Sequence, residues 1–168
     1  MPTGSAPPRS KPFDDADMVT EAVMAATRLL MGLSSRSIAS VDESITLPQF
    51  RLLSTLSAQG PLKLSSLADY LDVNPSTATR MIDRLIGSNL VSRQVNPNSR
   101  REIMVELTRN GANVVSKINE HRRTEIAGIV SSMPRSTRAD LVKALDAFNE
   151  AGKHIPICNH DPRAADLI

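Results

Sequence analysis

Arg80 and Arg84 stand four residues apart, directly after a group of hydroxyl side chains. In a helix, residues with this spacing lie on one face, so both guanidinium groups can point the same way. A guanidinium group donates paired hydrogen bonds to the major-groove edge of guanine, and hydroxyl groups bind phosphates or base edges. We therefore expect a helix whose exposed face contacts DNA. Its candidate hydroxyl residues are Ser76, Thr77 and Thr79.

The same face has a plainer interpretation, as a solvated surface on which Asp83 pairs with a neighbouring arginine. Arg84 fits a phosphate contact as well as a base contact, and Thr79 also fits a surface position without a ligand. The distribution of charge favours DNA for Arg80. Residues 76–109 contain six arginines against three acidic residues, a net charge of +3, whereas the whole chain carries only +2. Such local concentration suits phosphate binding, because affinity grows with the number of phosphates neutralised.

A second group of arginines lies in a segment that predicts a β-hairpin. Two short runs, Leu90–Val95 and Glu102–Leu107, flank a polar, turn-rich stretch. Two such runs around a turn indicate antiparallel strands with a protruding tip. The tip contains Arg100 and Arg101, which we expect to bind DNA beside the helix, whereas Arg93 also fits a solvated strand.

The helix that carries Arg80 and Arg84 has a defined start at Asn74-Pro75. Asn caps the free amide groups of a first turn, and Pro at the first helical position loses no needed hydrogen bond. The helix is expected to end near Ser88. A short helix, a turn and this helix, followed by a basic hairpin, form a layout typical of DNA-binding proteins.

Apolar residues at spacings of three and four predict five further helices. A breaker between Ser44 and Pro48 separates the first two. Ser65 and Ser66 are expected to cap the third, and Pro134 to end the fourth. The expected ranges are Asp15 to Ser40, Phe50 to about Gly60, about Ser65 to Leu71, Thr108 to about Met133, and Ser136 onward.

Composition limits the fold and the compartment. The 168 residues are 40% hydrophobic and only 2% aromatic, which favours packed helices over sheets. Residues 72–146 contain no aromatic side chain, so single-stranded nucleic acid has no stacking platform there. Cys158 is the only cysteine, which excludes an internal disulfide. No stretch resembles a signal sequence or a membrane span, so we expect a cytoplasmic protein.

Catalytic and metal chemistry have weak support. The sequence has no Gly-rich phosphate loop, no Gly-x-Ser-x-Gly motif and no His-Glu-x-x-His motif, so we expect neither an enzyme nor a cofactor. His154, Cys158 and His160 have suitable ligand chemistry, but they supply only three donors in a Pro-interrupted tail. A tail without metal is the favoured interpretation. A redox- or metal-responsive role for these residues is the alternative.

Several motifs of the central region match one known pattern in order and spacing. They are Thr46–Phe50 at the start of the second helix, Leu64–Leu71, Pro75–Leu85 and Gly87–Arg93 in the helix-turn-helix, and Asn96–Thr108 in the hairpin. With these motifs the chain resembles the MarR family of bacterial transcriptional regulators over residues 18–149. There is one departure. Where the family's wing commonly has Asp-x-Arg, this chain has Ser99-Arg100-Arg101, so Arg101 lacks its usual carboxylate partner.

The resemblance implies a mainly α-helical fold, in which a winged helix-turn-helix lobe with a small β-hairpin wing joins a dimerisation region of N- and C-terminal helices. It implies a homodimer that binds a pseudo-palindromic operator in double-stranded DNA. It also implies a repressor relieved by a small apolar or aromatic ligand that lies between lobe and dimerisation helices. The sequence itself contributes only an apolar, Met-containing surround that is compatible with such a pocket. The main alternative is a winged-helix module that binds protein, which has no need for so many arginines.

Apolar stripes on the terminal helices independently favour a partner chain, because a small lobe cannot cover them all. This reasoning gives five expected regions. They are a flexible tail at 1–14, a dimerisation helix at 15–45, the DNA-binding lobe at 46–108, dimerisation helices at 109–152 and a C-terminal tail at 153–168.

Overall fold

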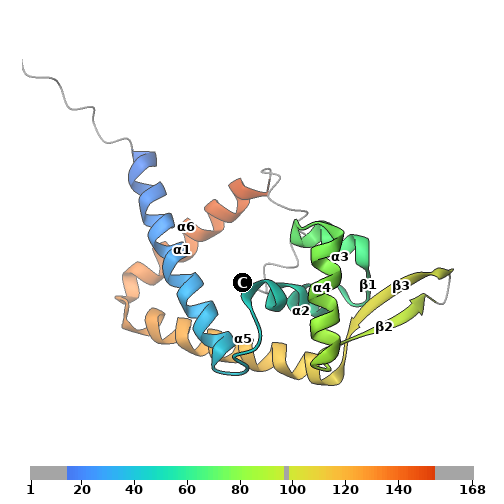
Figure 1. The fold of residues 1–168 in the computed structure, drawn as a ribbon. Helices are drawn as coiled ribbons and strands as arrows, with labels where there is room; N and C mark the ends of the chain where they lie inside the picture. Colours follow the sequence, from blue (N-terminus) through green and yellow to red (C-terminus); the bar gives the residue numbers. More distant parts are fainter. Residues whose placement is uncertain (1–14, 97–98, 154–168) are drawn as a thin grey trace, which may run out of the picture. The chain divides into compact units, whose positions relative to one another are not determined.

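The computed structural model describes residues 15–96 and 99–153, except the side chains of residues 96 and 99–102. Over these residues the chain is mainly helical with one small antiparallel sheet, which confirms the fold class expected from the sequence. The elements are α1 (Asp15–Ala39), α2 (Leu47–Gln59), β1 (Leu62–Lys63), α3 (Leu64–Leu71), α4 (Pro75–Gly87), β2 (Val91–Asn96), β3 (Ser99–Leu107), α5 (Arg109–Ser132) and α6 (Arg135–Gly152) (Figure 1).

The chain divides into two compact units, residues up to Gly32 and residues from Leu33 onward. The described part of the first unit is the beginning of α1, and none of its side chains is buried. The second unit contains the end of α1 and every other described element. The first part of α1 is therefore a helix whose apolar residues are not covered within its own unit.

The core of the second unit is built by α2, α3, α4 and the sheet, with the first half of α5 packed against them (Figure 1). Apolar residues recur along these helices every three or four positions, which gives each helix one face to bury. Burying a Leu or Ile side chain contributes about 1.5–3 kcal/mol. The side chains with no exposed surface are Leu52, Leu53, Leu67, Ala78, Ile82 and Ile118.

The start of α2 differs from the one that the apolar spacing predicts. The helix begins at Leu47 and not at Phe50, so Leu47 and Pro48 of the predicted breaker lie inside it, in agreement with the resemblance, which places Thr46–Phe50 at the start of the second helix. Thr46 accepts a hydrogen bond from the Gln49 backbone amide, and the Gln49 side chain accepts one from the Thr46 amide at 2.8 Å. Pro48 lies in the first turn, where a backbone N–H has no helical partner in any case. The proline therefore supports the helix start within this capping box.

The sequence pattern does not predict β1, because two residues are too few to show alternation. β1 pairs with β3 through Leu62 and Val105, and the sheet order is β1-β3-β2. α3 follows directly and begins at Leu64. Ser65 and Ser66, the expected caps, lie inside the helix because the strand pairing fixes where the chain turns into it.

The hairpin is longer than the sequence predicts. Its pairing extends to Asn96 on β2 and Ser99 on β3, so β3 begins before the expected Glu102. Arg100 and Arg101 therefore belong to strand β3 and not to the turn itself. A run of polar residues shows no apolar alternation, so the sequence pattern does not distinguish the outer part of the hairpin from its turn.

The turn between α4 and β2 is tied to the first turn of α5. The Thr108 hydroxyl accepts from the Gly111 amide at 3.0 Å and donates to the Asn89 carbonyl at 2.8 Å, which confirms Thr108 as the start of α5. Asn89 has a φ of 56°, a left-handed conformation that asparagine tolerates. A Cβ on Gly111 would lie 2.0 Å from the Leu90 carbonyl oxygen. Only glycine fits this contact, which fixes α5 against the end of α4.

Candidate nucleic-acid interface

α4 begins at the cap that the sequence predicts. The Asn74 side-chain oxygen accepts from the Thr77 amide at 2.8 Å and from the Ser76 hydroxyl at 2.7 Å. The Thr79 hydroxyl donates to the Pro75 carbonyl at 2.8 Å. The protons of the Ser76 and Thr79 hydroxyls are thus engaged within the helix start, and their oxygens keep the capacity to accept.

α4 has one apolar and one polar face. On the apolar face, Ala78, Ile82 and Leu85 are at most 2% exposed and hold the helix against the core. Every α4 residue predicted to contact DNA lies away from this buried row. Ser76, Arg80 and Arg84 are exposed, and Thr77 and Thr79 are half-buried.

An ion pair joins the polar face of α4 to the hairpin. Arg93 Nη2 of β2 lies 2.6 Å from Asp83 Oδ1, and both side chains are partly exposed. Asp83 therefore pairs with Arg93 and not with a neighbour on α4, which corrects the plainer sequence interpretation. Among the described residues, neither Arg80 nor Arg84 forms an ion pair. The sequence gives no signal for the pair, because its members lie on two elements that only tertiary packing brings together.

The hairpin face opposite to Arg93 carries a carboxylate held by hydrogen bonds. The Ser92 hydroxyl donates to Glu106 Oε1 at 3.2 Å, and the Gln94 side-chain amide donates to the same oxygen. Of the predicted wing residues, Arg100 and Arg101 have side chains outside the described residues. The effect of the missing carboxylate at position 99 on Arg101 therefore stays a prediction.

The predicted metal candidates His154, Cys158 and His160 also lie outside the described residues. Among the side chains that the structure describes, no three of His, Cys, Asp or Glu are grouped so as to hold a metal ion. Within residues 15–96 and 99–153, no helix has the length and apolar character needed to cross a membrane.

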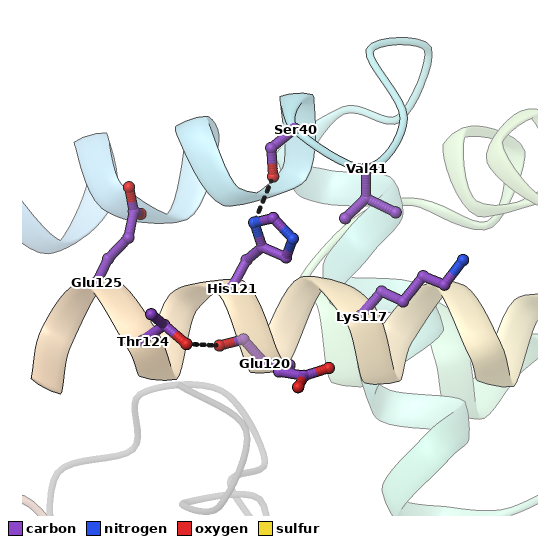
Figure 2. A pocket seen from close by; sticks show the side chains of 7 residues that line it. All are labelled: Ser40, Val41, Lys117, Glu120, His121, Thr124 and Glu125. Carbon is purple, nitrogen blue, oxygen red and sulfur yellow. Dashed lines mark hydrogen bonds between the residues drawn. The ribbon is translucent and has the colours of Figure 1, made fainter.

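A groove of about 620 Å³ lies between the end of α1 and α5 (Figure 2). Its lining is mostly polar or charged, unlike the apolar, Met-containing surround that the sequence analysis expects for a ligand. The Ser40 hydroxyl and His121 Nδ1 form a hydrogen bond of 3.1 Å at one side of it. The lining residues are Ser40, Val41, Lys117, Glu120, His121, Thr124 and Glu125.

α5 also contacts both neighbouring helices through charged side chains. Glu125 pairs with Arg36 at 2.7 Å and accepts a hydrogen bond from the Ser37 hydroxyl at 3.0 Å. Arg122 is 7% exposed and lies over the Phe50 ring, with its guanidinium carbon 5.0 Å from the ring centroid. Burial lowers the pKa of Arg122, because removal from water disfavours the charged form. These contacts connect α5 to α1 and α2 beside the groove.

Comparison with known proteins agrees with this architecture. The model of the MarR family matches residues 45–103, which include α4. A crystal structure of RV1404 from Mycobacterium tuberculosis is 50% identical, with a TM-score of 0.78 over 85% of this chain and 98% of that chain. A mutant MarR from E. coli, solved with operator DNA, is 23% identical, with a TM-score of 0.60 over 83% of this chain and 99% of that chain.

Two curated relatives match over shorter stretches. The transcriptional repressor MdtR of Bacillus subtilis is 39% identical over 69 residues, which are 41% of this chain and 44% of MdtR. The chain likewise spans 47% of YhbI, a second regulator of that organism. The helix-turn-helix and its β-hairpin define a winged helix-turn-helix protein. The chain belongs to the MarR family, a family of transcriptional regulators.

Proposed function

We propose that this chain is a transcriptional regulator that binds a specific site in double-stranded DNA as a homodimer, with α4 in the major groove. The Asp83–Arg93 ion pair carries the proposal, because it leaves Arg80 and Arg84 exposed with no acidic partner among the described residues. Two such guanidinium groups, one helical turn apart, fit a guanine edge and an adjacent phosphate.

The predicted site residues divide into two groups in this proposal. Arg80 contacts a base edge, and Arg84 contacts a base or a phosphate. Arg100 and Arg101 of the wing bind phosphates and the negative potential of a narrow minor groove. Three hydroxyl residues at the start of α4 complete the contact: Ser76, Thr77 and Thr79. The Thr77 hydroxyl donates to a phosphate, whereas the oxygens of Ser76 and Thr79, whose protons are engaged within the helix, accept from amino groups on base edges.

A second copy of the chain is the proposed cover for the apolar residues of the terminal helices. Four large apolar side chains of α6 are 36–59% exposed, and six of α1 between residues 18 and 31 are 42–62% exposed. Exposure of this extent marks an interaction surface. We therefore assign residues 15–45 and 109–152 to dimerisation and 46–108 to DNA binding. The two copies of α4 are then about 34–36 Å apart, one turn of DNA.

Repression and its relief by a ligand are proposed by analogy with relatives. MdtR is a repressor, and NadR, a structural neighbour, has been solved with 4-hydroxyphenylacetate. Of the charged residues in the groove beside α5, Glu125 is paired with Arg36, and Lys117 and His121 can bind a carboxylate against the one further acidic residue, Glu120. An aromatic acid therefore fits this lining better than a wholly apolar molecule.

Selection of bound sequences from random duplex DNA tests the DNA-binding part of the proposal. We expect enrichment of a pseudo-palindrome with half-sites about 10 base pairs apart, and a dimer by light scattering at micromolar concentration. A pool without an enriched motif would favour the protein-binding module instead.

Titration of phenolic acids into the protein–operator complex tests the ligand part. We expect release of DNA by at least one acid, and a weaker response in Lys117→Ala than in Lys143→Ala, a control on α6. Release that depends on an oxidant or on zinc and is lost in Cys158→Ser would favour the alternative of a redox- or metal-responsive tail.

A further inference from the structure

The hairpin exposes a pair of apolar side chains that its fold does not use. Val95 of β2 is 62% exposed and Ile103 of β3 is 53% exposed, and the two residues are direct cross-strand partners. The other apolar side chains described on these strands are buried or half-buried. Val95 and Ile103 therefore form an apolar patch in water on a protruding element.

The register places this patch on the α4 side of the hairpin. Directly paired residues of an antiparallel ladder share one face, and every second pair lies on the same side. The pair Arg93–Val105 precedes the patch on this side, with Val105 in the core and Arg93 bonded to Asp83 of α4. The patch lies one step further out, about 7 Å beyond that pair.

We infer that Val95 and Ile103 pack against the deoxyribose edges of the DNA minor groove next to the base pairs contacted by α4; this inference rests on the proposed DNA binding. The walls of that groove expose C–H groups of the sugars. Branched aliphatic side chains pack against such groups, whereas arginines pair with the phosphates. Arg100 and Arg101 follow within the same hairpin, and their charge complements the phosphates that border those sugars.

A protein partner fits the patch less well. Two side chains make an area far below that of a stable protein interface, so a second copy gains little from covering them. The adjoining arginines also favour a polyanion over an apolar protein surface. Duplex DNA fits a small apolar patch beside arginines, because α4 and the hairpin can contact the same duplex together.

The test is the double variant Val95→Thr/Ile103→Thr, which keeps β-branched side chains but makes them polar. We expect affinity for the selected operator and for a scrambled duplex to fall on the order of tenfold. The slope of affinity against salt should stay unchanged, because no charge is removed. The matched control, Val95→Ile/Ile103→Val, keeps the patch apolar and should bind like wild type.

Hydroxyl-radical cleavage reports on the sugars directly. Wild-type protein should protect minor-groove sugars beside the α4 site, and the threonine variant should lose this protection while guanine N7 protection by α4 persists. Binding and protection equal to wild type in a variant with the same thermal unfolding would refute the inference and leave the proposed function intact. Failure of wild type to bind any duplex would refute both. Should the double variant unfold, Val95→Thr alone gives the same comparison.

Discussion

The lobe and the terminal helices contain similar apolar residues but bury them differently. In the lobe, Leu52, Leu67 and Ile82 have no exposed surface, whereas Val142 and Phe148 of α6 are 59% and 53% exposed. The core of the lobe is completed by Ile38 at the end of α1 and by Val115 and Ile118 in the first half of α5, while α6 and the beginning of α1 need a further surface to cover their apolar residues. Substitutions in the two regions should therefore fail differently, in monomer stability for the lobe and in association for the terminal helices.

The largest effect is expected at the contact that fixes α5 to the lobe. Gly111→Ala places a methyl group 2.0 Å from the Leu90 carbonyl oxygen, a backbone atom that cannot rotate away. We expect the free energy of unfolding to fall by about 3 kcal/mol or more. Urea unfolding followed by circular dichroism measures this change.

The same helix supplies a matched control. Gly128 has open space around its Cβ position, so Gly128→Ala should stabilise the protein by up to about 1 kcal/mol through helix propensity alone. Equal destabilisation by both substitutions would show that the close contact with Leu90 is not what fixes α5.

The next effect concerns the terminal helices. Leu145→Glu/Phe148→Glu puts two charges on the exposed apolar side of α6. We expect the dimer to dissociate at micromolar concentration, with operator affinity lost as a consequence, while the thermal unfolding of the lobe remains cooperative. Light scattering measures the mass. Ala147→Glu adds a charge elsewhere on α6 and should leave the dimer intact. Dissociation of this control would contradict the assignment of the exposed apolar side of α6 to the dimer interface.

The comparison also explains which parts of the molecule could be predicted. Local patterns predict the order of helices, the Asn74 cap and the buried side of α4. Each of these features depends on apolar periodicity or capping within one short segment of the sequence. β1 and the full length of the hairpin were missed, because strand pairing is a non-local contact. The Asp83–Arg93 pair and the requirement for Gly111 were missed for the same reason. The polar groove depends on how α1 and α5 meet, which no local pattern encodes.

A smaller and more selective effect is expected within the interface itself. Arg80→Ala should reduce discrimination by about 1–3 kcal/mol at one base pair per half-site, because a base contact is lost. Arg101→Ala should weaken binding to operator and scrambled duplex alike and flatten the salt dependence. Binding isotherms at several salt concentrations on both duplexes measure this. Equal loss of sequence preference in the two variants would contradict the division between α4 and wing.

The smallest effect on stability is expected at the ion pair between α4 and β2. Because Asp83 and Arg93 are both partly exposed, their coupling energy in a double-mutant cycle should be below about 1 kcal/mol. Their effects on DNA binding should nevertheless have opposite signs. Asp83→Asn removes a negative charge and releases Arg93, so affinity for any duplex should rise and its salt dependence should steepen. Arg93→Gln leaves the Asp83 carboxylate unneutralised on the helix face that carries Arg80 and Arg84, so operator affinity should fall.

The double variant Asp83→Asn/Arg93→Gln distinguishes two roles of the ion pair: neutralising the charge of Asp83, and fixing the angle between α4 and the hairpin. If the pair serves to neutralise Asp83, removing both charges should restore operator affinity close to that of wild type, since no carboxylate remains to repel the phosphates. If the pair instead sets the angle between α4 and the hairpin, the double variant should bind as poorly as Arg93→Gln. Isotherms on the operator at fixed salt decide between these outcomes. Because the stability of the lobe rests on its buried core, we expect neutralisation to dominate and binding to be restored.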